Sequence, residues 1–347
     1  MARTDCVYLN AVREGKTIDE SQVYGCNIYE ECITDKLSSS MRSCIDCPDY
    51  LPKGSTEFAS QFKDPLNITD RRGVKTNVLR GMLSGSPTFL VCGGPSANEL
   101  DLSLLCQRGI WSMAVNNMAG HFHASSFVCS DPPSKFHSGI WLDPTMMKFI
   151  PTPKLRGSRG HLRTKLGDGT FKNLEKGGKQ IWTRDCPNVW AFERRSWHTS
   201  DDAFFLETSA AWGNHSAGVI RTGGKKTVCT MLLALRLLYY LGSRTIFLVG
   251  VDFQMDPTAE LKENYAFGEE RDLAAIKSNN DQFSVVGGWL SEMENKGVFK
   301  RFGLQIFNCN PRSGLRAFGH LSYNDAIAWA LDGFPREPFD VVGWYKK

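Results

Sequence analysis

The sequence predicts an α/β protein with a Rossmann-like, doubly wound and mostly parallel sheet. Between residues 86 and 145, and again from about residue 227, short apolar runs alternate with helix-like segments. Such alternation is typical of a parallel sheet covered by helices. Several of the apolar runs end in Gly, Asn or Asp, and in sheets of this class ligands bind at the carboxyl ends of the strands.

The chain divides into three parts. Residues 1–55 are predicted to form a cysteine-rich module, 56–85 a connector with one or two helices, and 86–347 the main domain. Within that domain, a stretch at 150–215 rich in Lys, Arg, Gly and Trp interrupts the α/β pattern, and we interpret it as a loop-rich insertion. The 347 residues, 41% of them hydrophobic, suffice for a large buried core.

The elements of the main domain are expected in the following order. Apolar runs predict strands at 87–94, 110–117, 125–132, 244–253 and 304–311. Helix-like segments lie between and after them, at 96–109, 227–240, 281–297 and 322–331. The segment 227–240, "TVCTMLLALRLLYY", is apolar on nearly all sides, which predicts a buried helix.

Four cysteines near the N-terminus have the spacing of a metal site: Cys26, Cys32, Cys44 and Cys47, with Cys6 as a possible substitute for one of them. Four thiolates around one Zn²⁺ would order a segment that is too short to build its own core. A closed four-thiolate site leaves no open position for a substrate, so this Zn²⁺ is expected to be structural. Free cysteines and an iron–sulfur cluster are the alternatives.

The glycine turn "CGGPS" lies where the first strand passes into the first helix. Gly93 and Gly94 would let the backbone approach a ligand phosphate or sugar, and Ser96 is placed to cap the helix. An ordinary tight turn is the alternative interpretation. The other strands end in polar residues, which are expected to gather at the same edge of the sheet: Asn116, Asn117, Asp131, Asp252, Asn308 and Asn310.

Three stretches together resemble bacterial sialyltransferase-like glycosyltransferases: "LVCGGPSANELDLSLL…MAVNN", "TMLLALRLLYYLGSRTIFLVGVDF…NYAFG" and "FGLQIFNCNPRSGL". The resemblance covers about residues 86–135 and 216–320, and extends to phage proteins of this kind with an N-terminal cysteine pattern. More distantly, the GPS turn and the Gly-x-Asp strand end are similar to 6-hydroxymethylpterin pyrophosphokinases. The resemblance implies a GT-A-type domain that binds a nucleotide-sugar donor.

The resemblance also assigns roles to residues. It implies that the donor contacts Gly93, Gly94, Pro95, Ser96, Asn116 or Asn117, and Thr227, while Asp252 completes the site and Tyr265 assists departure of the leaving phosphate. The histidine that serves as catalytic base in the family is missing from "AAIKSNNDQFSV", so the base is open among Asp131, Asp252, His137 and His215. Because "VDFQMD" is not a DxD motif, no obligatory catalytic metal is expected.

The basic stretch suggests a polyanionic acceptor. Lysines and arginines neutralise phosphates and aromatic rings stack on bases, and the candidates for nucleic-acid contacts are Lys154, Arg156, Arg159, Arg163, Arg194, Arg195 and Trp197. Together with these residues, the resemblance to phage glycosyltransferases implies hydroxymethylpyrimidine DNA as the expected acceptor. A solvated basic surface, or arginines that hold only the donor diphosphate, would explain the same residues.

Net charge, hydropathy and the N-terminal sequence constrain the function less closely. The formal charge of +4 is only mildly basic, and no apolar run approaches the length of a membrane span. The N-terminus "MARTDCVYLN" lacks an apolar signal core, which predicts a cytoplasmic protein, in the host cytoplasm if a phage encodes it. The oligomeric state is open. Transfer to a glycan or small molecule, a pyrophosphokinase, and a non-catalytic DNA-binding module are the alternative functions.

Overall fold

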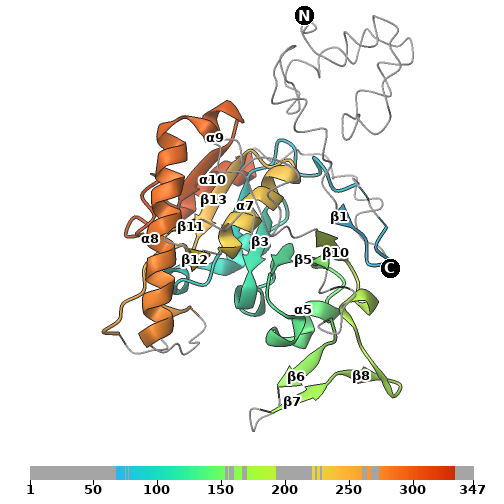
Figure 1. Cartoon of the computed structure of the whole chain (residues 1–347). Helices are drawn as coiled ribbons and strands as arrows, with labels where there is room; N and C mark the ends of the chain where they lie inside the picture. The colour runs from blue at the N-terminus through green and yellow to red at the C-terminus, as the bar shows by residue number, and fades with distance from the viewer. Residues whose placement is uncertain are drawn as a thin grey trace, which may run out of the picture.

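The computed structural model describes residues 68–74, 76, 78–152, 155, 160–165, 170–192, 221–222, 225–226, 229–259, 264–266 and 273–332. These residues form a central, mostly parallel sheet with helices on both faces (Figure 1), so the predicted α/β class is confirmed. The predicted cysteine module, including Cys6, Cys26, Cys32, Cys44 and Cys47, lies outside the described residues. None of the described helices is long and apolar enough to cross a membrane.

The main sheet has nine strands, in the spatial order β1 (Ile68–Thr69), β10 (Val189–Phe192), β5 (Met147–Pro151), β4 (Ser126–Val128), β3 (Trp111–Val115), β2 (Thr88–Val91), β13 (Thr245–Val249), β14 (Gln305–Asn308) and β15 (Gly319–His320). Every neighbouring pair is parallel except β1 with β10. From β2 the chain builds outward through β3, β4, β5 and β10, and then returns to place β13 on the other side of β2. The strand order therefore reverses between β2 and β13, where α/β sheets of this kind bind ligands.

Both faces of the sheet are buried because side chains on the central strands alternate between two apolar clusters. Phe89 and Phe247 belong to one cluster, whereas Leu90 and Leu248 belong to the other. The second of these clusters is covered by α7 (Thr230–Tyr240), α8 (Leu273–Asn295) and α9 (Val298–Arg301). On the opposite face, α10 (Tyr323–Asp332) packs against the sheet, with the ring centroids of Phe89 and Tyr323 6.3 Å apart.

The prediction of a single helix at 96–109 is wrong. The chain there forms two 3-10 helices, η2 (Pro95–Glu99) and η3 (Leu102–Cys106). Leu100 between them is extended, and the Asp101 side chain accepts a hydrogen bond from the Ser103 amide to begin a new turn. Neither element is long enough to develop the aligned dipole of a full α-helix. Ser96 is not a helix cap, since the cap position falls on Gly94 and no side-chain capping bond forms.

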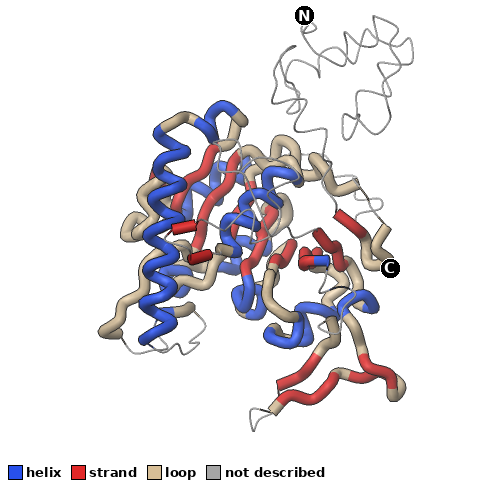
Figure 2. The backbone as a smooth tube through the Cα atoms, in the orientation of Figure 1, coloured by secondary structure: helices blue, strands red, loops and turns tan. Residues whose placement is uncertain are grey.

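Three strands of the main sheet lie outside the predicted α/β segments, and one of them, β5, spans the start of the predicted insertion. From the connector, β1 pairs with β10, and β10 itself comes from the stretch predicted to be an insertion. Between β5 and β10 the hairpins β6 (Arg163–Lys165)–β7 (Phe171–Asn173) and β8 (Glu175–Lys176)–β9 (Lys179–Gln180) extend away from the sheet (Figures 1 and 2). We refer to the described residues between 160 and 182 as the arm.

A lysine is buried in the sheet. Lys148 in β5 is 0% exposed, and its Nζ donates hydrogen bonds to the carbonyl oxygens of Asp143 and Pro187, the latter at 3.0 Å. Because burial disfavours the charged form, the pKa of Lys148 falls from 10.5 to about 8, although Asp143 and Cys186 nearby partly oppose this. The Lys148 ammonium joins the loops at the amino ends of β5 and β10, on the side of the sheet opposite the carboxyl ends of the strands.

Candidate functional site

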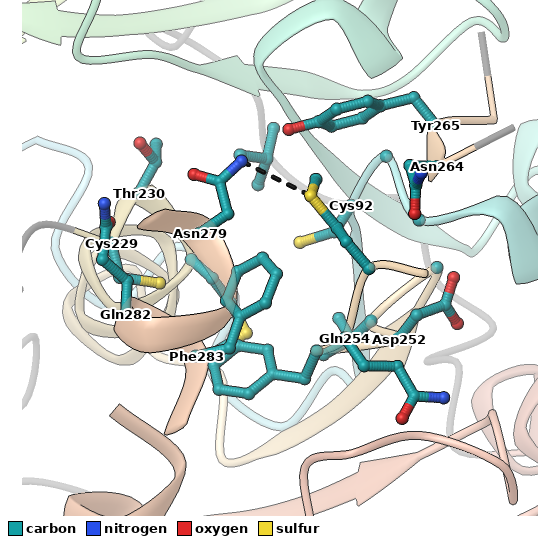
Figure 3. A pocket seen from close by; sticks show the side chains of 18 of the residues that line it. Cys92, Cys229, Thr230, Asp252, Gln254, Asn264, Tyr265, Asn279, Gln282 and Phe283 are labelled. Atoms are coloured by element: carbon teal, nitrogen blue, oxygen red, sulfur yellow. Dashed lines mark hydrogen bonds between the residues drawn. The ribbon is translucent and has the colours of Figure 1, made fainter. Parts of the chain in front are cut away.

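A cavity of about 230 Å³ opens where the strand order reverses, at the carboxyl ends of β2, β3 and β13 (Figure 3). Its apolar lining residues include Cys92, Val115, Cys229, Met231, Phe253, Phe283 and Val286. Its polar lining residues are Asn116, Thr230, Asp252, Gln254, Asn264, Tyr265, Asn279 and Gln282. No Lys or Arg belongs to this lining within the described part of the chain.

The loops after β2 and β13 interlock through two glycines. A Cβ on Gly94 would lie 2.3 Å from Asp252 Oδ2 and 2.6 Å from the Gly250 carbonyl oxygen. A Cβ on Gly250 would lie 2.2 Å from the Cys92 carbonyl oxygen. The Gly94 amide also donates a 2.9 Å hydrogen bond to the Gly250 carbonyl. Gly94 is therefore small because a neighbouring loop occupies the space beside it, a reason independent of any ligand, although both glycines also line the cavity.

Asp252 holds three strand ends together. Its Oδ2 accepts a 3.0 Å hydrogen bond from the Ser96 amide after β2, and its Oδ1 accepts one from the Asn310 side chain after β14. Its carbonyl oxygen accepts another from the Gly314 amide at 2.7 Å. The carboxylate is buried, at 8% exposure, yet it borders the cavity. The predicted gathering of the glycine turn, Asp252 and Asn310 at one edge is thus observed.

A second hollow, a groove of about 280 Å³, continues outward from the cavity. Asp252, Gln254 and Asn264 line both spaces, so the two adjoin. The groove is lined mainly by polar residues, with three carboxylates and one guanidinium, and its other lining residues are Pro95, Ser96, Glu99, Asp256, Ala259, Asn310 and Arg312. Arg312 is paired with Glu99. Two hydrogen bonds from Thr258 lower the pKa of the Asp256 carboxyl.

The outer wall of the cavity is fixed by α8. The rings of Phe253 and Phe283 stack with centroids 4.8 Å apart and planes 27° apart. Asn280 donates to and accepts from the backbone of Met255, both at 2.8 Å, and so ties the loop after β13 to the helix. Figure 3 shows Asn279 and Phe283 of α8 facing Tyr265 across the space. The Phe253–Phe283 pair is therefore held in place by the stacking of its rings and by the hydrogen bonds between Asn280 and Met255.

Two polar atoms near the site are buried without a hydrogen-bond partner: Asn116 Oδ1 at the end of β3 and Ser96 Oγ in η2. Asn116 has a φ of 55°, which directs the chain sharply into η4 (Asn116–Gly120). An unsatisfied buried acceptor costs about 1–3 kcal/mol. A ligand that donates a hydrogen bond to Asn116, or that bonds with the Ser96 hydroxyl, would recover part of that cost.

The two thiols in the cavity wall are poorly suited to act as nucleophiles. Burial raises the pKa of Cys92 far above its ordinary value, and the neighbouring Cys229 and Asp252 add to the effect. The pKa of Cys229 is also raised by burial. Since the reactive form of cysteine is the thiolate, both side chains act as small apolar packing groups.

The structure separates the other predicted residues. Asp131 follows β4 but is not part of either lining, and its carboxylate pairs with Lys135 at 3.2 Å. Asn117 is likewise absent from both linings, whereas Asn116 and Tyr265 line the cavity. His137 Nδ1 accepts a hydrogen bond from the Gly139 amide and so caps α5 (Ser138–Leu142).

Several candidates lie outside the described residues: Thr227, His215, Lys154, Arg156, Arg159, Arg194, Arg195 and Trp197. Of the predicted nucleic-acid contacts, only Arg163 is described, exposed on β6.

Sequence reasoning missed the contribution of α8. Asn279, Gln282, Phe283 and Val286 recur at helical spacing on one face, which is a detectable signal, but a polar-apolar stripe of this kind usually packs in the core. The groove residues Asp256, Asn264 and Arg312 belong to no sequence motif that would indicate a binding site. Comparison of the chain with models of protein families, with curated proteins and with solved structures found no match.

Proposed function

We propose that the protein is a nucleotide-sugar-dependent glycosyltransferase whose main domain is of the Rossmann-like, GT-A type. One observation carries the proposal: a cavity with an aromatic wall and a groove lined mainly by polar residues adjoin at the point where the strand order reverses. A nucleotide sugar has the same division, with a flat aromatic base at one end and a hydroxyl-rich ring at the other. Fold alone does not decide chemistry, so the division of the site is the stronger argument.

The donor would lie with its base inward. The Phe253–Phe283 wall offers an aromatic face for stacking, and Asn116, Asn279 and Gln282 offer amides for the edge of the base. The sugar would lie in the groove, where carboxylates and amides such as Asp256, Asn264 and Asn310 suit hydroxyl groups. This orientation leaves the diphosphate beside Gly93 and Gly94.

Positive charge for the diphosphate would come from the hairpin β11 (Arg221–Thr222)–β12 (Lys225–Lys226). Lys226 precedes the cavity residue Cys229 by three positions, so their Cα atoms are at most about 11 Å apart. The predicted donor residue Thr227 lies on the same connection. Lysines at this place would offset the charge that the inner cavity itself does not neutralise.

In the reaction, the oxygen of an acceptor hydroxyl forms a bond to the anomeric carbon, and the bond from that carbon to the phosphate oxygen breaks. The acceptor proton passes to a general base, and the Tyr265 hydroxyl stabilises the leaving phosphate. Both oxygens of Asp252 already accept hydrogen bonds from the protein, so we assign it a positioning role. Asp256 in the groove is then the more accessible carboxylate, beside the earlier candidate Asp131.

The acceptor is proposed to be hydroxymethylpyrimidine DNA, held by the basic residues between β5 and β10, and a structural Zn²⁺ is proposed for the N-terminal cysteines. The second candidate function is a pyrophosphokinase of the 6-hydroxymethylpterin type. It is favoured by a cavity whose aromatic wall also suits a flat pterin ring.

A donor and acceptor panel tests the proposal. The full chain is incubated with UDP-, GDP- and CMP-sugars and hydroxymethylated DNA, and the nucleosides are analysed by mass spectrometry. A parallel reaction contains ATP, Mg²⁺ and hydroxymethylpterin. Transfer from one sugar donor, weakened at least about tenfold in Phe283→Ala through lost stacking but not in the exposed control Lys277→Gln, supports the assignment. Turnover of ATP without sugar transfer replaces it with the second candidate.

A further inference from the structure

The tip of the arm has an arrangement of charge that its own fold does not explain. Lys176 and Lys179 are direct cross-strand partners in the β8–β9 hairpin, and both are exposed. Directly opposed side chains on neighbouring strands have Cβ atoms only about 5 Å apart, so two like charges there repel each other. Among the described residues, neither lysine has a carboxylate partner.

The turn between the two lysines consists of two glycines and therefore has no side chains. Gly177 and Gly178 both have positive φ, 59° and 73°, as a two-residue hairpin turn of this type requires. A Cβ at either position would meet nothing within 4 Å. The hairpin therefore ends in a narrow edge of backbone, with one lysine on each strand, both on the same face, and no bulky side chain ahead of them.

The arm is anchored firmly at its base. Leu162 is buried, and Leu174 and Ile181 pack beside it against one core cluster. Backbone hydrogen bonds of 2.8–3.0 Å run from Leu162 to Ile181, from Leu174 to Leu162 and from Ile181 to Leu174, and join the two hairpins. The apolar side chains at the base thus face the core, while Lys172, Lys176 and Lys179 are exposed beyond it.

Charge over the arm has one dominant sign. Five of its described residues are basic and only Glu175 is acidic: the basic ones are Arg163, Lys165, Lys172, Lys176 and Lys179. At the base, the guanidinium of Arg184 lies 5.2 Å from the centre of the Trp182 ring. A rigid two-stranded ribbon with an excess of lysine matches duplex DNA, since the major groove admits a β-ribbon and the phosphates beside it bind ammonium groups.

The arm lies on the same side as the candidate site. β6 contacts η5 (Pro133–Lys135), which follows the carboxyl end of β4. β4 is two strands from β2, which leads into the glycine turn.

We propose that the β8–β9 tip is a DNA-backbone clamp in which Lys176 and Lys179 contact phosphates across a duplex groove. The choice of DNA rests on the proposed function, but the clamp does not depend on sugar transfer. Binding is therefore measured with the full chain and no donor, by fluorescence anisotropy on an unmodified duplex of about 25 base pairs at salt concentrations from about 50 to 200 mM.

The double variant Lys176→Gln/Lys179→Gln is expected to bind about tenfold more weakly at ~0.1 M salt and to reduce the slope of log K against log salt by about 2. Lys176→Arg/Lys179→Arg should keep the affinity, because it keeps the charge. The matched control Lys277→Gln/Lys300→Gln removes two exposed lysines from α8 and α9 and should leave both values unchanged.

Three outcomes overturn the clamp: no binding of wild-type protein to the duplex, an unchanged salt slope in the tip variant, or equal losses in the tip and control variants. Tighter binding to anionic vesicles or to an acidic polypeptide than to DNA, abolished by the same tip variant, also overturns it in favour of another partner. If DNA binding depends on the tip while the donor panel is negative, the clamp stands and the glycosyltransferase proposal fails.

Discussion

Gly94 has a structural reason to be small that the sequence does not show. Glycine at a strand–helix junction suggested room for a ligand, yet the space beside its Cα is filled by Asp252 and Gly250. The same fact makes Gly94 unsuitable as a probe of donor binding, because a larger residue would force apart the loops after β2 and β13. Loss of activity in such a variant would report damage to the fold.

Gly94→Ala is expected to lower the free energy of unfolding by about 1–3 kcal/mol, since overpacking forces the backbone to shift. Gly120→Ala is the control, because a Cβ there meets nothing within 4 Å. Urea unfolding of the two variants and the wild type gives the comparison. Equal stabilities for the two variants would show that the loops after β2 and β13 can separate at little cost.

Lys148 should make stability depend on pH in the alkaline range. Burial lowers its pKa from 10.5 to about 8, so between these values the unfolded chain binds more protons than the folded protein. The free energy of unfolding should therefore rise with pH across this window, by up to about 3 kcal/mol. Lys148→Met lacks the titrating group and should lack this contribution.

The measurement is urea unfolding of the wild type and of Lys148→Met at several pH values from about 7.5 to 10.5. The titrations of other groups largely cancel in the difference between the two proteins. The free energy of unfolding of the wild type should therefore increase relative to that of the variant as the pH rises. Parallel curves would mean that Lys148 keeps an ordinary pKa in the folded protein.

At the scale of elements, α8 contains a glycine without a structural reason. Gly288 is exposed in the middle of the helix, and a Cβ there meets nothing within 4 Å. Gly288→Ala should raise the free energy of unfolding by about 0.5–1 kcal/mol, because glycine loses more backbone entropy in a helix than alanine does.

Gly297 provides the matched comparison, since it has equally open space but a φ of 68° between α8 and α9. Gly297→Ala should destabilise the protein by about 1 kcal/mol, because L-residues disfavour this conformation. Thermal unfolding of both variants tests the pair. A loss of stability in Gly288→Ala would contradict the assignment of Gly288 to an exposed helix interior.

The strands were more predictable than the 3-10 helices. Long apolar runs such as 87–94 and 244–253 contain the central strands, because burial on both faces leaves a continuous apolar signal. The helix at 96–109 was mispredicted because its periodicity is interrupted at Leu100 and Asp101 by a local hydrogen bond. β10 escaped prediction because it consists of only four apolar residues and lies next to a basic, glycine-rich stretch.

The candidate site was only partly predictable. Gly93, Gly94, Asn116, Asp252 and Tyr265 line the cavity, and parallel strands bring such residues to one edge. The wall formed by α8 depends on how the helix docks, which no local pattern encodes. Asp131 lines neither space, because the end of β4 lies two strands from β2, and its carboxylate pairs with Lys135.

For the molecule as a whole, the zinc prediction tests whether the N-terminal part is a metal module. Purified full-length protein should contain about one Zn²⁺ per chain, measured by plasma mass spectrometry, because four thiolates form a closed site. Cys44→Ser/Cys47→Ser should lose the metal, whereas Cys106→Ser, which removes an exposed thiol of the main domain, should retain it. Zinc retained by the double variant would exclude Cys44 and Cys47 as ligands.

The pairing of β2 with β13 has a consequence for synthesis. Thr88 pairs with Ile246, so the ribosome must complete most of the chain before the inner edge of β2 can be covered. Until then, a nascent protein carrying β2 to β5 would present that bare edge to other polypeptides, a known route to aggregation. Translation that stalls between the arm and β13 should therefore yield insoluble fragments and create a demand for chaperones.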